Sequence, residues 1–183
     1  MCDIPLGPYQ RERIVLCSGD ASPRSQRNIP GEAGYFFPGG KWVGATRNSA
    51  ERLNCRFVIF AGPYGLVNPW QIIAPYDVPG HTEEEQTMIR DRLFQTIPLL
   101  IGGDRYDVVF LYAGANPREI IIEMMWPILK DNSIDLVTFG KPNTGDLGKL
   151  DNVVELLIRG TTPNELSEIL RFPQRLKYLH DCG

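Results

Sequence analysis

Four short runs of apolar residues, rich in β-branched side chains, recur along the chain and constrain its fold more than any other feature. They occupy residues 13–17, 56–60, 107–112 and 134–139. Each run is almost continuously apolar, which is typical of strands covered on both faces in a parallel sheet. Helical patterns lie between and after them, at residues 42–53, 82–101, 116–130, 149–159 and from 162 onward. This alternation predicts an α/β fold, a single three-layer α/β/α domain with a mainly parallel sheet of about four strands.

The length and composition favour one globular domain. A chain of 183 residues with 43% hydrophobic and 22% charged residues resembles folded proteins, not disordered or collagen-like ones. We assign the polar, irregular residues 1–12 to an N-terminal arm and residues 13–183 to the domain. The formal charge of −3 argues against tight non-specific binding to duplex DNA, but it leaves room for a local basic cleft.

The absence of targeting patterns and the cysteine spacing lead us to expect a cytoplasmic protein. No apolar run approaches the roughly 18 residues that cross a bilayer, and the first residues lack the pattern of a signal peptide. The four cysteines form no C-x-x-C pair, so we expect reduced thiols. There are only two histidines, and none is suitably spaced from a cysteine. We therefore expect no bound metal, no cofactor and no membrane partner.

Small residues form the turns after three of the predicted strands. Ligands of open parallel α/β sheets bind outside the carboxyl ends of the strands, where small residues expose backbone amides that can hold anions. The residues expected to line such a substrate-binding rim are Cys17, Ser18 and Gly19, then Gly62 and Gly65, then Ala113 and Gly114. The alternative is that the glycines only make strand-to-helix turns.

The most distinctive stretch is residues 60–77, which read FAGPYGLVNPWQIIAPYD. Tyr64 and Tyr76 offer flat faces to a base or sugar, and the prolines fix the path of the chain. Asp77 could activate water or stabilise an oxocarbenium ion, as glycosidic bond cleavage requires, or it could be a turn residue. His81 could act as a general base or lie on the surface at a helix start. The whole stretch could instead be a structural Ω-like loop.

Three residues on the predicted rim, Cys17, Ser18 and Arg118, have both a chemical and a structural interpretation. The Cys17 thiol could be a nucleophile, but the sequence offers no partnered base, and a small buried residue fits better. Ser18 could contact a phosphate through its hydroxyl group. Arg118 stands at a helix start on the ligand edge, where it could pair with a phosphate or be an exposed helix residue.

These pieces together resemble a known group of proteins. The matching residues are Cys17-Ser18-Gly19, Gly34-Tyr35-Phe36, the stretch 61–77 and Tyr112-Ala113-Gly114. Over residues 13–130 the chain resembles the superfamily of YaaA-type peroxide-stress proteins and their short relatives. The short relatives follow the first Cys-Gly with Lys or Arg, whereas this chain has Asp20-Ala21-Ser22. The resemblance implies an α/β fold near that of uracil-DNA glycosylases and, for YaaA-type proteins, DNA binding under oxidative stress.

Three functional hypotheses follow. The first is a hydrolase, a glycosidase acting on a nucleobase N-glycosidic linkage in a nucleotide or nucleic acid, with Asp77 and His81 as catalytic residues. The second is a non-catalytic DNA- or nucleotide-binding protein of a stress response. The third is a structural partner in a larger modification complex. For the first two hypotheses, we expect the partner to be a nucleotide-like small molecule or a nucleic acid.

Overall fold

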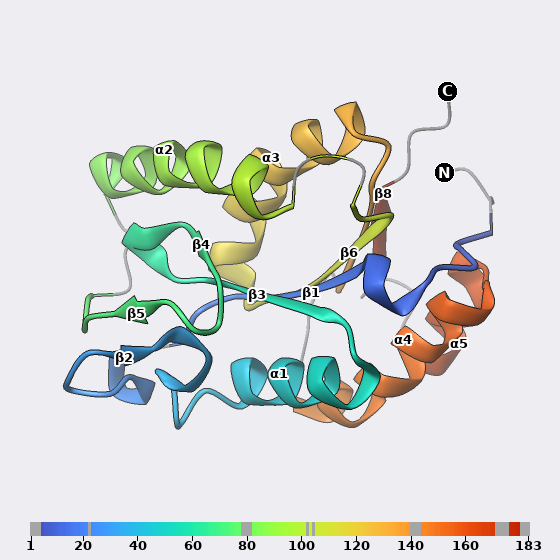
Figure 1. Ribbon diagram of the computed structural model, residues 1–183, viewed down its shortest axis with the longest axis horizontal. Helices are drawn as coiled ribbons and strands as arrows, with labels where there is room; N and C mark the ends of the chain where they lie inside the picture. Colours follow the sequence, from blue (N-terminus) through green and yellow to red (C-terminus); the bar gives the residue numbers. More distant parts are fainter. Residues whose placement is uncertain are drawn as a thin grey trace.

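The centre of the molecule is a six-stranded sheet in which four parallel strands carry an antiparallel strand at each edge (Figure 1). The computed structural model describes residues 5–21, 23–77, 82–101, 103, 105–139, 144–170 and 176–179. Across the sheet the strands are Leu66–Val67 (β4), Arg56–Phe60 (β3), Ile14–Ser18 (β1), Val108–Tyr112 (β6), Asp135–Phe139 (β7) and Leu176–Leu179 (β8). The four parallel strands β3, β1, β6 and β7 coincide with the four apolar runs. The predicted α/β class with a mainly parallel sheet is confirmed.

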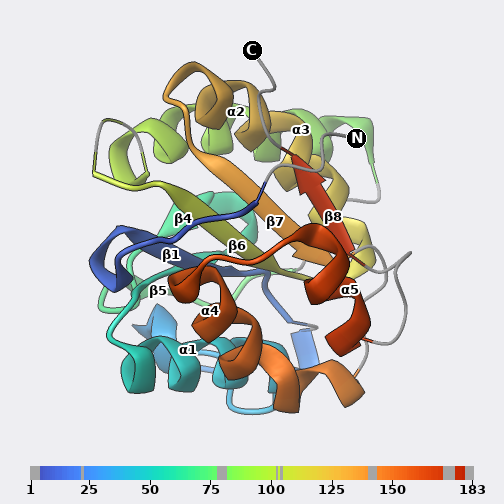
Figure 2. The same cartoon turned by 90° about the vertical axis from the view of Figure 1, so that its right-hand side faces the viewer.

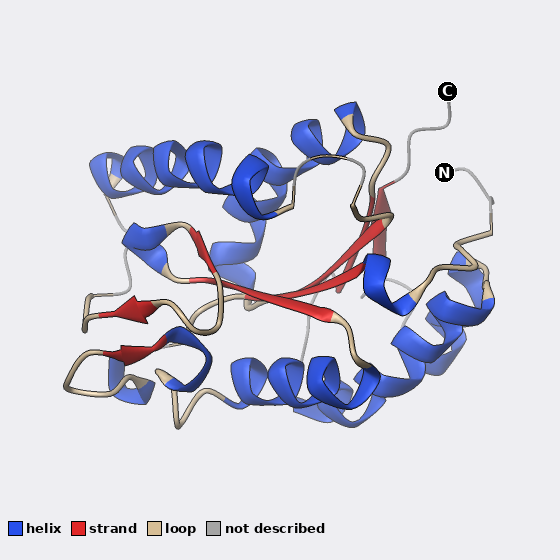
Figure 3. Cartoon of the chain, in the orientation of Figure 1, coloured by secondary structure: helices blue, strands red, loops and turns tan. Residues whose placement is uncertain are grey.

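Helices cover both faces of the sheet and complete three layers (Figure 1, Figure 3). The α-helices are Lys41–Leu53 (α1), Glu83–Leu100 (α2), Ala115–Asp131 (α3), Leu150–Arg159 (α4) and Pro163–Leu170 (α5). Short 3-10 helices span Arg11–Arg13 (η1), Pro23–Ser25 (η2), Ala33–Tyr35 (η3), Gly62–Tyr64 (η4) and Thr144–Lys149 (η5). One face carries α2 and α3, and the other carries α1, α4 and α5. No helix in the described ranges is long and apolar enough to cross a membrane.

Each parallel strand sends alternate side chains into two separate cores, because successive side chains of a strand point to opposite faces. In β1, Ile14 and Leu16 join the core beneath α1 and α4, whereas Val15 and Cys17 join the core beneath α2 and α3. Both faces of the sheet are therefore buried, as the continuous apolar runs predict.

Capping boxes begin two helices at the predicted places. The Thr82 hydroxyl accepts a hydrogen bond from the Glu85 amide at 3.1 Å, and the Glu85 carboxylate accepts one from the Thr82 amide at 3.2 Å. Thr162 and Glu165 make the same exchange at α5, at 3.2 and 2.8 Å. Each box satisfies amides that the first helical turn leaves without a partner.

The segments that follow β1 and β3 contain short strands that pair with each other. Gly31–Glu32 (β2) runs antiparallel to Ile72–Ile73 (β5), on one side of the main sheet (Figure 1). The Ala33 amide extends this contact by donating to the carbonyl oxygen of Gln71 at 2.9 Å. Two-residue strands are too short to show an alternating pattern in the sequence, so this pairing is visible only in the structure.

The region before β1 makes contacts that its polar composition does not predict. Leu6 is fully buried and forms an isolated antiparallel bridge with Thr161. The Tyr9 hydroxyl donates to the Asp135 carboxylate at the start of β7. The described part of the arm thus packs against α4 and α5, near the edge where β8 pairs with β7 (Figure 2).

Candidate functional site

The candidate site lies where the order of the parallel strands reverses. Numbered along the chain, the four parallel strands stand in the order 2-1-3-4, since the chain moves one way from β1 to β3 and the other way from β6 to β7. Ligands of open α/β sheets bind at such a switch point, outside the carboxyl ends of the strands. Here the switch point lies between β1 and β6, and α1 and α3 follow on opposite faces (Figure 1).

A cavity of about 340 Å³ lies at this point, and we call it the switch-point cavity. It is lined by Asp20, Ala21, Ser25, Gly39, Gly40, Lys41, Trp42 and Gly114. These residues come from the turn after β1, the approach to α1 and the turn after β6. The volume falls within the range of about 300–1,000 Å³ that is usual for small-molecule sites.

Asp20 is the one acidic residue among the described residues that line the switch-point cavity. The residue is partly buried, and its buried Oδ1 atom has no hydrogen-bond partner among the described residues. The Tyr76 hydroxyl donates to Oδ2 at 3.0 Å. Burial raises the pKa of Asp20 to about 7, and the hydrogen bonds from Tyr76 and from the Asp20 backbone only partly oppose that rise. The carboxyl group can therefore take up or release a proton near neutral pH.

Tyr76 attaches the loop after β3 to the end of β1. Its amide donates to Gln26 Oε1 at 3.1 Å, and its ring lies parallel to that of Phe36 with centroids 6.5 Å apart. Burial, and then the negative charge of Asp20, raise the pKa of the Tyr76 hydroxyl. The hydroxyl therefore stays protonated and remains a donor to Asp20, whose position it fixes.

Trp42 gives the switch-point cavity an aromatic wall. It lies in the first turn of α1, and its ring centroid is 4.8 Å from that of Tyr112 at the end of β6. Ser18 is opposite Tyr112 in the parallel pairing, and it points to the α1 face because Leu16, two residues earlier, does so. The Ser18 hydroxyl is buried and has no partner within the described part of the chain.

Cys17 points to the opposite face of the sheet from Ser18. It is fully buried in the core beneath α2 and α3. Burial raises the pKa of its thiol to about 12, so the thiol stays protonated at neutral pH. This environment favours the packing interpretation of Cys17 over the nucleophilic one.

Gly62, Tyr64 and Gly65 shape the turn that leads from β3 to β4. Gly65 has a φ of +71°, and a Cβ atom there would lie 2.5 Å from Thr96 Oγ1 on α2. The Tyr64 hydroxyl accepts a hydrogen bond from the Ala74 amide at 3.1 Å. Gly62 is buried and also has a positive φ, of +43°. All three residues therefore hold the loop in place, whether or not they also contact a ligand.

Ala113, Gly114 and Arg118 lie around the start of α3. Gly114 lines the switch-point cavity, and a Cβ atom added to Gly19 would lie 2.8 Å from the Cβ atom of Ala113. Arg118 is buried and donates through Nη2 to Glu119 at 3.2 Å. Its Nη1 atom is buried without a partner among the residues described. This guanidinium group keeps donor capacity that an anion could use.

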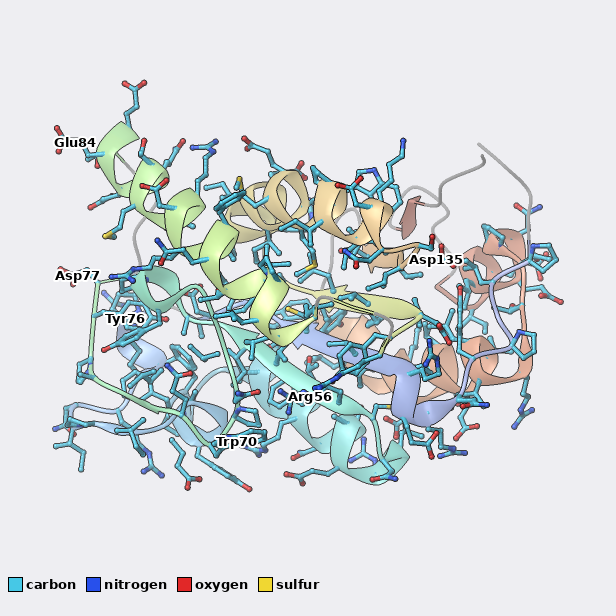
Figure 4. All side chains as sticks on the ribbon, turned by 45° about the horizontal axis from the view of Figure 1, so that its top comes forward. Arg56, Trp70, Tyr76, Asp77, Glu84 and Asp135 are labelled. Atoms are coloured by element: carbon cyan, nitrogen blue, oxygen red, sulfur yellow. The ribbon has the colours of Figure 1, made fainter. Side chains whose placement is uncertain are left out.

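The structure places Asp77, predicted to be catalytic, at the outer end of its loop, where it is exposed (Figure 4). The other predicted catalytic residue, His81, lies outside the described residues. The carboxyl group that lines the switch-point cavity is that of Asp20, which the sequence analysis does not select.

A sequence signal for Asp20 exists. It stands directly after the small residues that end β1. A carboxylate at such a place is a candidate in its own right. Trp42 gives no comparable signal, because only the packing of α1 against β1 and the contact of the Trp42 ring with Tyr112 bring that ring to the cavity.

Among the described residues, no three His, Cys, Asp or Glu side chains form a group that could hold a metal ion. Comparison with protein-family models, curated proteins and solved structures finds no match to this chain. The resemblance to the YaaA-type superfamily stays a prediction from the sequence motifs.

Proposed function

We propose that this chain is a hydrolase that cleaves the N-glycosidic bond between a nucleobase and its sugar, with Asp20 as the catalytic carboxyl group. One observation carries the proposal: Asp20, whose buried Oδ1 atom has no hydrogen-bond partner among the described residues, lines a cavity at the switch point of the sheet. Trp42 lines the same cavity and offers an aromatic surface to a base. The motif resemblance, which implies a fold near that of uracil-DNA glycosylases, supports the same class of reaction.

The proposed reaction breaks the C1′–N bond and adds water to C1′. The bonding electron pair leaves with the base, which takes up a proton, while the sugar passes through an oxocarbenium-like state. Ionised Asp20 would stabilise the positive charge on the sugar and accept a proton from the attacking water. A pKa of about 7 allows Asp20 to return that proton to solvent or to the departing base at neutral pH.

Neighbouring groups would orient the reactants. Tyr76 is a positioning residue, because its hydroxyl holds Oδ2 of Asp20. The Oδ1 atom has no partner among the described residues and would accept a hydrogen bond from the water. Gly114 allows close approach of a sugar to the backbone, since no atom lies within 4 Å of the place a Cβ would occupy.

The test is incubation of the protein with nucleosides, nucleotides and short single- and double-stranded DNA containing normal and modified bases. Released base is measured by chromatography with mass spectrometry. We expect Asp20→Asn to lower the rate about 100-fold or more, the usual effect of removing an acid–base group. Asp91→Asn, which changes an exposed carboxylate on α2, is the matched control and should leave the rate unchanged. Asp77→Asn tests the carboxylate favoured by the sequence motif.

The outcomes separate the hypotheses. Loss of turnover in Asp77→Asn, with full activity in Asp20→Asn, would return the catalytic role to Asp77. Saturable binding of a nucleotide without any released base would instead support the non-catalytic receptor, and it would remove the glycosidase. Binding of no probe at all would leave only the structural partner of a larger complex.

A further inference from the structure

A second cavity, of about 540 Å³, adjoins the switch-point cavity. The two share Gly40 and Lys41 in their walls. The second cavity is lined further by Arg27 and Arg47 and by the aromatic ring of Tyr35, and we call it the cationic cavity. No acidic residue is among the described residues that line it.

The positive charges of the cationic cavity are not compensated within the described part of the chain. No described carboxylate lies within 4.0 Å of the charged groups of Arg27, Lys41 or Arg47, whereas five other arginines do form ion pairs. The chain as a whole carries a formal charge of −3, so this concentration of positive charge is local. Like charges gathered around one space repel, and an anion in that space relieves the repulsion.

The Arg47 side chain is held in place by neutral groups. Its Nη1 atom donates to the carbonyl oxygen of Gly34 at 2.8 Å, and its Nη2 atom donates to Asn48 Oδ1 at 3.1 Å. The guanidinium carbon lies 4.3 Å from the ring centroid of Tyr35. The Arg27 amide donates to the carbonyl oxygen of Phe36 at 2.8 Å, which fixes its backbone beside the same wall. Such preorganisation lowers the entropy lost when an anion binds.

We infer that the cationic cavity binds a phosphate group of the substrate, so the substrate is phosphorylated and is not a free nucleoside. The inference rests on the proposed function, which assigns the base to the switch-point cavity. In a nucleotide the base and the 5′-phosphate are attached at opposite ends of the sugar, at C1′ and through C5′. Two adjoining cavities, one with Asp20 and Trp42 and the other with three cations, match that division. The phosphate belongs either to a nucleoside monophosphate or to a phosphodiester in a strand.

The experiment measures binding, so it does not depend on turnover. Calorimetry compares nucleoside 5′-monophosphates, the matching nucleosides and single-stranded octanucleotides on the wild-type protein. We expect the phosphorylated probes to bind about tenfold more tightly than nucleosides, the value of one charge-assisted contact. Arg27→Gln and Lys41→Gln should each remove most of that advantage, and added salt should reduce it. Arg24→Gln, an exposed cation of the same loop outside the cavity, is the control.

Equal affinity for nucleosides and their phosphates, or an advantage that survives both Arg27→Gln and Lys41→Gln, overturns the phosphate site. Neither result would contradict a glycosidase activity that depends on Asp20. Conversely, phosphate-dependent binding without released base overturns the glycosidase and leaves the phosphate site intact. An advantage shown by monophosphates supports a free nucleotide as the phosphate source, and one shown only by octanucleotides supports a strand.

Discussion

The Tyr76 hydroxyl donates a 3.0 Å hydrogen bond to Oδ2 of Asp20, although 56 positions separate the two residues along the chain. The bond joins the loop after β3 to the turn after β1. Asp20 lines the switch-point cavity, and the ring of Tyr76 lies parallel to that of Phe36. The hydrogen bond therefore attaches the loop to the wall of the cavity. Changes at either residue are therefore expected to alter both proton binding in the site and the attachment of the loop.

Burial of Asp20 makes the stability of the protein depend on pH. Its pKa rises from an ordinary value of 3.8 to about 7 in the folded state, so the folded state binds this proton more tightly than the unfolded state. The stabilisation is complete below about pH 4 and is lost as the pH rises to about 7. Asp20→Asn should thus match the wild type near pH 4 and exceed its free energy of unfolding by about 2–4 kcal/mol near pH 8.

Urea unfolding across this pH range tests the prediction. Asp91→Asn, on the exposed face of α2, should follow the wild-type curve. Parallel pH curves for Asp20→Asn and the wild type would show that Asp20 ionises normally in the folded protein.

Removing the Tyr76 hydroxyl should change the proton affinity of Asp20. The hydrogen bond from Tyr76 lowers the pKa of Asp20, so Tyr76→Phe should move that pKa upward from about 7. The rate of base release would then increase with pH over a higher pH range than in the wild type, while the rate at alkaline pH would change less. Tyr106→Phe, distant in sequence and outside the cavity wall, is the control. An unchanged profile in Tyr76→Phe would remove Asp20 from the rate-controlling ionisation.

Gly65 is predicted to be intolerant of a side chain. Its φ is +71°, and a Cβ atom would lie 2.5 Å from Thr96 Oγ1 and 2.9 Å from the carbonyl oxygen of Arg92. Gly65→Ala should lower the free energy of unfolding by about 2–4 kcal/mol, through both strain and overlap. Gly103→Ala has a similar φ of +85° with no atom within 4 Å, so it should cost only about 1 kcal/mol. Equal losses in the two variants would show that overlap with α2 is unimportant.

Cys17 should resist alkylation in the folded protein. Its thiol is fully buried, and burial raises its pKa to about 12, so little thiolate forms. Iodoacetamide treatment near neutral pH, followed by peptide mapping, should leave Cys17 unmodified until denaturant is added. Cys17→Ala should also retain turnover. Rapid modification of Cys17 in the native protein would revive the nucleophilic interpretation.

The local elements were predictable because their signals are local. A continuous apolar run such as residues 107–112 must be buried on both faces wherever it lies, and this requirement yields a parallel sheet with helices on each side. The reciprocal bonds of Thr82 and Glu85 follow from the spacing of the two residues. By contrast, β2 and β5 are too short to leave a pattern, and the burial of Leu6 depends on a partner at Thr161.

The sequence by itself determined the class of fold, the four parallel strands and the rim of small residues where ligands of such sheets bind. Only the tertiary structure decided which carboxyl group stands in the cavity. Asp77 has the more suggestive sequence context but is exposed, while Asp20 lines the switch-point cavity and carries the Tyr76 hydrogen bond. The reason is physical: the periodicity of a strand is set by its own residues, whereas the burial and proton affinity of a side chain are set by segments that meet it only after folding.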